Sequence, residues 1–360
     1  MITSHSYAGR YWQDIAIDFE SRPEKLGLLS LGKFSPPPWS KVNNHVKYLA
    51  MNDNKSFDPF LLPKLFFTVR AYKPDVIQTH LFRAGLLGLL FGRVLRVPVV
   101  VTRHHIDEHV QSGTFIHRFL DRITLTVASA VIVRSAAAKK WLISQENGDT
   151  KRIHIVNQGF DFQLLALNSE QILVAKQELG FNSECFNVLC VARYSQTKGQ
   201  EYLVQAIALL ANDLPKLRLT FVGPGDSRWL SNLIRDLNLE KITNILPARD
   251  DIPACLAAAD LVVHPSLVDS FSQLLIEVQA VGTAIIATDI AAASEQISDG
   301  VSGIIVPPRD QVALAAAISQ LYFNPEMKES MGKEGAKIVR RKYQVKEMVE
   351  KDLEVLRSVL

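Results

Sequence analysis

The sequence is poor in cysteine and has no long apolar run. Its 3 cysteines among 360 residues form neither a disulfide framework nor a zinc-ligand spacing. The apolar stretch at residues 86–91 is interrupted by Gly88 and is far shorter than the ~20 residues that span a membrane. The polar start Met1-Ile2-Thr3-Ser4-His5 does not resemble a signal peptide. We therefore expect a cytoplasmic protein that can contact the cytoplasmic face of a membrane but does not cross it.

Two common ligand-binding signatures are also missing. No Gly-x-Gly-x-x-Gly sequence follows the first predicted strand, which argues against a dinucleotide-dependent oxidoreductase. The basic residues are scattered, and no aromatic stacking platform accompanies them. We therefore expect no nucleic-acid partner.

The small net charge of +3 hides an asymmetry along the chain. Residues 1–165 hold 21 Lys and Arg against 13 Asp and Glu, whereas the remainder holds 19 against 24. Eight of the 9 histidines also lie in the first part. This asymmetry predicts an anionic partner for the first part, or it reflects two domains of different composition, and both interpretations stay open.

Short apolar runs alternate with stretches of helical spacing. Continuous apolar strands separated by helices predict parallel sheets covered on both faces. The regular spacing of predicted strands is interrupted between residues 160 and 186. We therefore expect two doubly wound α/β domains, 1–165 and 166–342, followed by a C-terminal segment, 343–360. The predicted strands are 26–31, 76–79, 97–102, 130–133, 152–156, 187–191, 217–222, 242–246, 261–264, 284–288 and 303–306.

Polar residues and glycines follow several of these strands. Ligands bind beyond the carboxyl ends of parallel strands, so these residues predict a site. A single histidine at a strand end can equally be structural. The residues are His80, Arg103-His104, Arg193, Gly223-Pro224-Gly225 and His264-Pro265-Ser266.

A helix is predicted directly after His264-Pro265-Ser266, with Asp269 or Ser270 as its N-cap. Its first amides, from Ser270 to Gln273, would suit a phosphate. Glu277 shares a face of this helix with apolar residues and is predicted to be buried. A buried carboxylate needs a polar ligand or an internal cation, and both alternatives remain.

Arg193 and Lys198 lie five residues apart on a loop that leads into a helix. Together they can neutralise a diphosphate, although a solvated loop also favours both residue types. Combined with a helix start and a carboxylate on the same sheet edge, the pair predicts a site for a diphosphate attached to a polyol.

This pattern resembles the retaining glycosyltransferase family 4 of the GT-B fold. Arg193 with Lys198-Gly199 is similar to the family's diphosphate-binding residues, and Asp269 with Glu277 occupies the two positions of its E-x7-E element. The strand that ends in Gly223-Pro224-Gly225 also matches. The resemblance covers most of the chain from Asp75 onward. It implies two Rossmann-like domains facing a central cleft, with 343–360 forming a helix that returns to the first domain.

The resemblance also implies roles for single residues. Glu277 would bind the ribose hydroxyls, Arg193 and Lys198 the diphosphate, and Asp269 the donor sugar, with His104 near that sugar. No metal and no cofactor are expected, because two cations and a helix start supply the positive charge. Further substrate-binding positions are His80, Gly223, Gly225, Ala248, Arg249, Ser270, Phe271, Ser272 and Gln273. Of these, Ala248 and Arg249 lie in the segment that is expected to approach the nucleotide base.

Several positions depart from the family pattern. Asp269 is one methylene shorter than the usual Glu, and Ser272 replaces a Gly. Ala291-Ala292 replaces Gly-Gly, Gln158 replaces Asn, and the first glycine-rich loop is reduced to Ser6-Tyr7-Ala8-Gly9-Arg10. The shorter Asp269 is expected to alter donor preference, and the added Cβ atoms at Ser272 and Ala291-Ala292 to crowd a sugar or phosphate. The reduced first loop is expected to change the acceptor side.

The preferred hypothesis is a retaining transferase that moves a hexose-type unit from a UDP- or GDP-linked sugar to an acceptor. The acceptor is expected to be a lipid-linked or cell-surface glycan bound by the basic first domain, in contact with an anionic membrane. One alternative is a catalytically weak relative that binds nucleotide or glycan in a regulatory or assembly role. Another is a nucleotide-sugar epimerase.

Overall fold

The computed structural model describes residues 2–3, 10–19, 22–31, 46–50, 61–104, 115–290 and 293–360. The chain divides into two compact units, one formed by Met1–Asp161 with Tyr343–Leu360 and the other by Phe162–Lys342. The departures from the family pattern at residues 6–9 and 291–292 lie outside the described residues. Within the described residues, no helix is both long enough and apolar enough to cross a bilayer.

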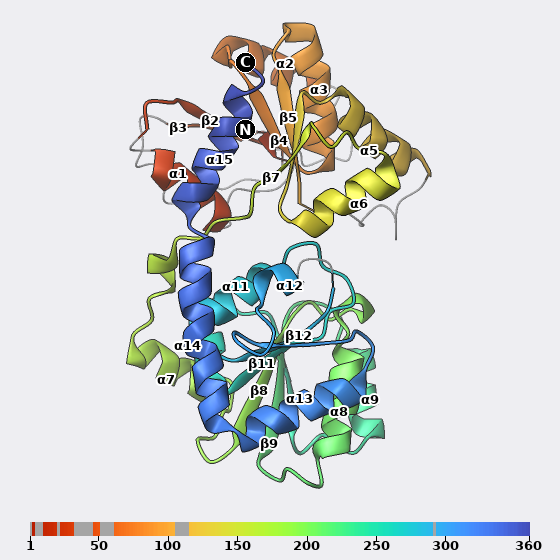
Figure 1. Ribbon diagram of the computed structural model, residues 1–360, viewed down its shortest axis with the longest axis vertical. Helices are drawn as coiled ribbons and strands as arrows, with labels where there is room; N and C mark the ends of the chain where they lie inside the picture. The colour runs from red at the N-terminus through yellow and green to blue at the C-terminus, as the bar shows by residue number, and fades with distance from the viewer. Residues whose placement is uncertain are drawn as a thin grey trace. The chain divides into compact units, whose positions relative to one another are not determined.

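The described strands of the first unit form a seven-stranded sheet in the order β3-β2-β1-β4-β5-β6-β7 (Figure 1). Every pairing in this sheet is parallel. The strands are β1 (Ile2–Thr3), β2 (Leu26–Ser30), β3 (Val46–Ala50), β4 (Ile77–His80), β5 (Val99–Arg103), β6 (Ala130–Val133) and β7 (Ile153–Ile155).

Helices bury both faces of this sheet, which explains its continuous apolar strands. Along β5, Val99 and Val101 pack into one core, whereas Val100 packs into the core on the other face. The described helices of the unit are α1 (Arg10–Phe19), α2 (Leu61–Tyr72), α3 (Phe82–Leu95), α5 (Phe115–Val127), α6 (Ala136–Glu146) and α15 (Val345–Arg357).

The last helix of the chain belongs to the first unit. Figure 1 shows α15, in blue, among the red and orange elements from the start of the chain. Met348 and Leu353 of α15 share a core with Trp12 and Ile15 of α1. The Phe160 amide donates to the Tyr343 carbonyl at 2.8 Å, just before α15 begins. Residues 343–360 are therefore integral to the folding of the first unit.

The second unit repeats the same architecture. Its six described strands are parallel, in the order β10-β9-β8-β11-β12-β13. They are β8 (Phe186–Val191), β9 (Leu217–Val222), β10 (Thr243–Leu246), β11 (Leu261–His264), β12 (Ile285–Thr288) and β13 (Ile304–Val306). The predicted pair of doubly wound parallel sheets is confirmed, and the predicted ranges 130–133, 217–222 and 261–264 match β6, β9 and β11 at both ends.

Helices again cover two faces, with separate cores on each. The glycines at the contact between α11 and α14 allow a close approach, because a Cβ at Gly332 would lie 1.9 Å from the Gly282 carbonyl oxygen. The described helices are α7 (Ser169–Glu178), α8 (Gln200–Leu210), α9 (Arg228–Asp236), α10 (Ile252–Ala258), α11 (Gln273–Ala280), α12 (Ala293–Gln296), α13 (Gln311–Phe323) and α14 (Pro325–Lys342).

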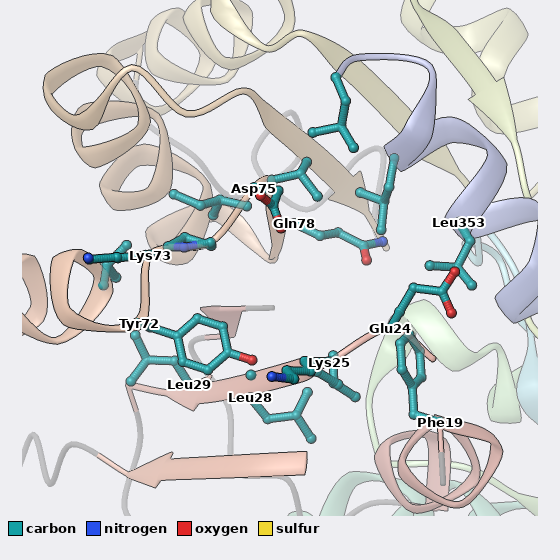
Figure 2. Close-up of a pocket in the computed structure, with 18 of the residues that line it drawn as sticks. Phe19, Glu24, Lys25, Leu28, Leu29, Tyr72, Lys73, Asp75, Gln78 and Leu353 are labelled. Atoms are coloured by element: carbon teal, nitrogen blue, oxygen red, sulfur yellow. The ribbon is translucent and has the colours of Figure 1, made fainter. Parts of the chain in front are cut away.

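A cavity of about 710 Å³ in the first unit lies at the amino ends of β2 and β4. Figure 2 shows the Tyr72 ring reaching over β2, where a Cβ at Gly27 would lie 2.8 Å from the ring. Leu353 of α15 lines the cavity from another side. His80 stands at the opposite, carboxyl end of β4. The cavity is therefore separate from the strand ends where the sequence predicts a site in this unit.

Candidate functional site

The loop after β8 carries Arg193 and Lys198. Gln196–Lys198 form a short 3-10 helix, which Gly199 ends with a φ of 62°. A Cβ at Gly199 would lie 2.0 Å from the Pro265 carbonyl oxygen, so only glycine permits this approach. The close approach brings the Lys198 loop against the loop that follows β11.

Lys198 and Asp269 form an ion pair across these two loops. The Nζ of Lys198 lies 3.2 Å from Oδ2 of Asp269, with side chains 19% and 21% exposed. The Nε2 of buried His264 lies 3.6 Å from the same oxygen, beyond hydrogen-bond distance. Burial alone would raise the pKa of Asp269, but His264 and Lys198 outweigh it and hold that pKa well below its ordinary value. Asp269 is therefore a carboxylate at neutral pH.

Arg193 is exposed, and its loop is shaped by the turn after β9. A Cβ at Gly223 would lie 1.9 Å from the Ala192 carbonyl oxygen, and Gly225 has a φ of 117°. The Tyr194 amide donates to the Pro224 carbonyl at 2.8 Å. The two predicted glycines thus position the main chain that carries Arg193.

The start of α11 differs from the sequence prediction. Ser272 is the N-cap residue, so the prediction of Asp269 or Ser270 is wrong. The Asp269 carboxylate lies against Lys198 instead of capping the helix. The Ser272 amide donates to Oε1 of Gln296 at 3.1 Å, and Nε2 of Gln296 donates to the Ser272 carbonyl at 2.8 Å. An anion at this helix start would therefore meet the amides from Gln273 onward.

The buried face of α11 is also turned relative to the prediction. Glu277 is half-buried, whereas Gln279 is fully buried. Gly335 of α14 packs on this side, since its Cβ would lie 3.1 Å from Cγ of Gln279. Glu277 therefore keeps the partial exposure that contact with a ligand requires. Ser270 and Ser272 are buried, Phe271 is half-buried and Gln273 is exposed.

In the first unit, His80 and His104 come together as strand-end residues. The Nδ1 of His80 lies 2.9 Å from Nε2 of His104, and the Trp12 ring meets His80 edge-on at 4.7 Å between centroids. Burial is the main cause that holds the pKa of His80 well below its ordinary value, and the nearby His104 and Arg134 lower it further. His80 is therefore a neutral, buried group beside half-buried His104.

Ala248 and Arg249 follow β10, where the sequence predicted a contact with the nucleotide base. Ala248 is exposed. Arg249 is held by Asp251, with Nε 2.7 Å from Oδ1, and by Glu178 of α7. Hydrogen bonds that Arg249 donates to Asp251 and Glu178 raise the pKa of its guanidinium. The contact with the base stays a prediction.

The sequence interpretation missed the buried glutamines that hold these loops, Gln200, Gln279 and Gln296. Gln279, between Val278 and Ala280, carries the signal of an amide among apolar residues. Gln200 and Gln296 each stand next to a glutamate and carry no such signal. In the described part of the chain, no three His, Cys, Asp or Glu side chains gather as metal ligands. The expected independence from metal stays a prediction.

In the second unit, two cations, two carboxylates and the start of α11 thus follow the carboxyl ends of strands in one parallel sheet. The charged residues are Lys198, Arg193, Asp269 and Glu277. A cation and free helix amides bind phosphate oxygens, whereas carboxylates accept hydrogen bonds from sugar hydroxyls. The arrangement suits a sugar linked to a diphosphate.

Comparisons with known proteins find glycosyltransferases among the relatives of this chain. A D-inositol 3-phosphate glycosyltransferase from Pseudarthrobacter chlorophenolicus is 29% identical over 282 residues, covering 73% of this chain and 66% of the relative. The enzyme of the same name from Corynebacterium kroppenstedtii is 27% identical over 277 residues, covering 72% and 61%. This chain thus spans less than two thirds of the length of either relative.

The fold has close counterparts among solved structures. HepE from Anabaena, solved in complex with UDP and glucose, matches with a TM-score of 0.85 at 22% identity, covering 99% of both chains. The family model described as Glycosyltransferase Family 4 matches residues 31–164. The model described as Glycosyl transferases group 1 matches residues 172–338. With the two models matched in succession along most of its length, the chain belongs to glycosyltransferase family 4 and has the GT-B fold.

Proposed function

We propose that the protein transfers a sugar from a nucleoside diphosphate sugar to an acceptor hydroxyl, with retention of the anomeric configuration. The bond between the sugar C1 and the β-phosphate oxygen breaks, and C1 bonds to the acceptor oxygen. The proton of the acceptor hydroxyl is taken up by the departing diphosphate, and the nucleoside diphosphate is released. The observation that carries this proposal is the Lys198–Asp269 pair at 3.2 Å, which sets a cation for phosphate beside a carboxylate for sugar.

Roles follow from the same placement. Lys198 and Arg193 stabilise the charge that develops on the departing diphosphate, together with the amides at the start of α11. Asp269 accepts hydrogen bonds from the donor sugar, and half-buried Glu277 accepts them from the ribose. His104, beside His80, is also proposed as a residue that contacts the donor sugar.

The proposed donor nucleotide is uridine diphosphate. HepE has been solved with UDP and glucose, and this chain shares its fold over 99% of its length. Guanosine diphosphate is the second candidate, because diphosphate contacts do not distinguish the two bases. Hydrogen bonds from main-chain groups near Ala248 would provide that distinction.

The proposed acceptor carries phosphate. Two relatives are named for D-inositol 3-phosphate, and residues 1–165 have an excess of basic residues. A lipid-linked glycan presents the same chemistry at a membrane surface. Exposed Leu90 and Val94 on α3 and Phe119 on α5 accompany exposed Arg93 and Arg122, which supports contact with anionic lipid.

The test is release of nucleoside diphosphate from UDP- and GDP-linked sugars, with inositol 3-phosphate and lipid-linked glycans as acceptors. We expect turnover with a uridine donor, unchanged by EDTA. Lys198→Ala is expected to lower kcat/KM at least 100-fold, because it removes charge-assisted hydrogen bonds worth about 3 kcal/mol together. Lys216→Ala, at an exposed lysine, is the control. Full turnover by Lys198→Ala would overturn the assignment.

A catalytically weak protein with a binding role remains the competing proposal. It predicts nucleotide binding without turnover for every donor and acceptor pair. A thermal-shift titration detects such binding, since ligand at about 100 times its Kd stabilises the folded state by about 2.7 kcal/mol. Stabilisation by UDP without any release of product would favour this alternative.

A further inference from the structure

A buried glutamine holds the loop that carries Arg193. Gln200, the first residue of α8, is 0% exposed. Its Nε2 donates to the Arg193 carbonyl at 3.0 Å, and its Oε1 accepts from the Ser195 amide at 3.4 Å. The side-chain amide thus closes a pair of hydrogen bonds on the main chain of the loop, two residues apart.

A second buried glutamine holds the start of α11 in the same manner. Gln296, 3% exposed at the end of α12, pairs with the amide and the carbonyl of Ser272. Gln279 supports it, because Nε2 of Gln279 donates at 2.9 Å both to the Gln296 carbonyl and to the Leu275 carbonyl. The N-cap residue, the body of α11 and α12 are therefore linked through side-chain amides.

A primary amide suits this task because it offers a donor and an acceptor that point in nearly the same direction. In Gln200 and Gln296 both groups are satisfied by the main chain opposite, which can therefore adopt few other conformations. A methionine of similar volume would fill the space but would release the main chain.

We infer that Gln200 and Gln296 are positioning residues for the donor diphosphate, with Gln279 holding Gln296 in place. This inference rests on the proposed function. Gln200 orients the loop that presents Arg193, and Gln296 orients the amides that follow Ser272. Each glutamine acts through main-chain groups and does not itself contact the donor. Arg193 and the amides after Ser272 are therefore in position before the donor binds. Binding then avoids the entropic cost of ordering these loops.

The experiment compares Gln296→Met, Gln200→Met and Gln279→Met with the unmodified chain. Gln320→Met, at an exposed glutamine on α13, is the matched control. Loss of two buried hydrogen bonds is expected to weaken UDP binding in calorimetry about tenfold for the first two variants. The KM for the donor should rise in proportion, whereas the KM for the acceptor should not change. Gln279→Met should show a smaller effect, about threefold.

Hydrogen–deuterium exchange gives a readout that needs no nucleotide. The Ser272 amide should exchange at least tenfold faster in Gln296→Met, and the Ser195 amide in Gln200→Met, each without effect on the other loop. Variants that melt at lower temperature but keep normal exchange at these amides and a normal donor KM would overturn the inference. If the unmodified chain binds no nucleoside diphosphate, the proposed function is contradicted. Exchange at the Ser195 and Ser272 amides would still show whether the glutamines fix the two loops. If Gln296→Met does not fold, Gln200→Met decides the outcome by itself.

Discussion

The Nζ of Lys198 lies 3.2 Å from Oδ2 of Asp269, although the two residues are 71 positions apart in the chain. The cation assigned to the donor diphosphate is thus already paired with the carboxylate assigned to the donor sugar. A bound diphosphate must compete with Asp269 for Lys198. This competition makes the pair a determinant of donor affinity as well as of reaction rate.

Replacement of Asp269 should separate these two effects. Asp269→Asn removes the competing charge, so we expect UDP to bind about threefold to tenfold more tightly, whereas turnover falls because the sugar loses an ionic acceptor. Calorimetry with UDP and steady-state kinetics measure the two effects. Asp269→Glu, which keeps the charge, should leave UDP affinity within about twofold. Weaker UDP binding by Asp269→Asn would contradict the competition.

The approach of the Lys198 loop to the loop after β11 depends on Gly199. In Gly199→Ala, the new Cβ would lie 2.0 Å from the Pro265 carbonyl oxygen at a φ of 62°. Gly300→Ala is the matched control, because Gly300 has a φ of 71° but no atom within 4 Å of its Cβ position. We expect both variants to lose about 1 kcal/mol of stability from backbone strain. The steric overlap should cost Gly199→Ala further stability, and only this variant should lose UDP affinity in calorimetry. Equal UDP affinity in the two variants would show that the contact with Pro265 is unimportant.

Asp352 ties the last helix to the first unit. Its Oδ1 lies 3.7 Å from Nη1 of Arg134, with both side chains almost fully buried. Asp352→Leu leaves the Arg134 charge buried without this carboxylate and should destabilise the unit by about 3 kcal/mol. Urea unfolding followed by circular dichroism measures the loss. Glu354→Leu, on the exposed side of α15, should change stability by less than about 0.5 kcal/mol. Similar losses in both variants would argue against a role for the buried pair.

The stability of the first unit should depend on pH through His80. Burial and the nearby His104 and Arg134 hold the pKa of His80 well below its ordinary value of 6.5. The unfolded chain therefore binds this proton more readily than the folded chain does. The stabilisation is fully present above about pH 6.5 and is lost as the pH falls toward the lowered pKa. Tm should fall between pH 7.5 and pH 5.5, and His80→Gln should show a smaller decrease over the same range. An equal decrease in both proteins would exclude His80 as the titrating group.

The sequence predicted the elements of the second unit well because its strands are continuous apolar runs between helices of clear periodicity. Phe221 and Val222 lie in opposite cores of the same sheet, and both sides of β9 had to be apolar. Arg193, Lys198 and Asp269 were identified because each follows a strand, and parallel strands end at one edge.

The sequence failed at α11, where the predicted N-cap was wrong and Glu277, predicted to be buried, is half-buried. The N-cap is Ser272 because the Asp269 carboxylate pairs with Lys198, which comes from a distant part of the chain. The buried polar residue is Gln279 because α14 packs on that side through Gly335. Local patterns contain neither partner.

By itself, the sequence determined the two parallel sheets and the strand ends that carry the charged residues, because periodicity and apolar runs are local properties. The tertiary structure alone decided which charges meet, which face of α11 is buried and which glutamines hold the loops. Those choices depend on partners such as Lys198 with Asp269 and Gln296 with Ser272, which are distant in sequence. Burial favours such pairings, because a polar group removed from water costs free energy unless it finds a hydrogen-bond partner.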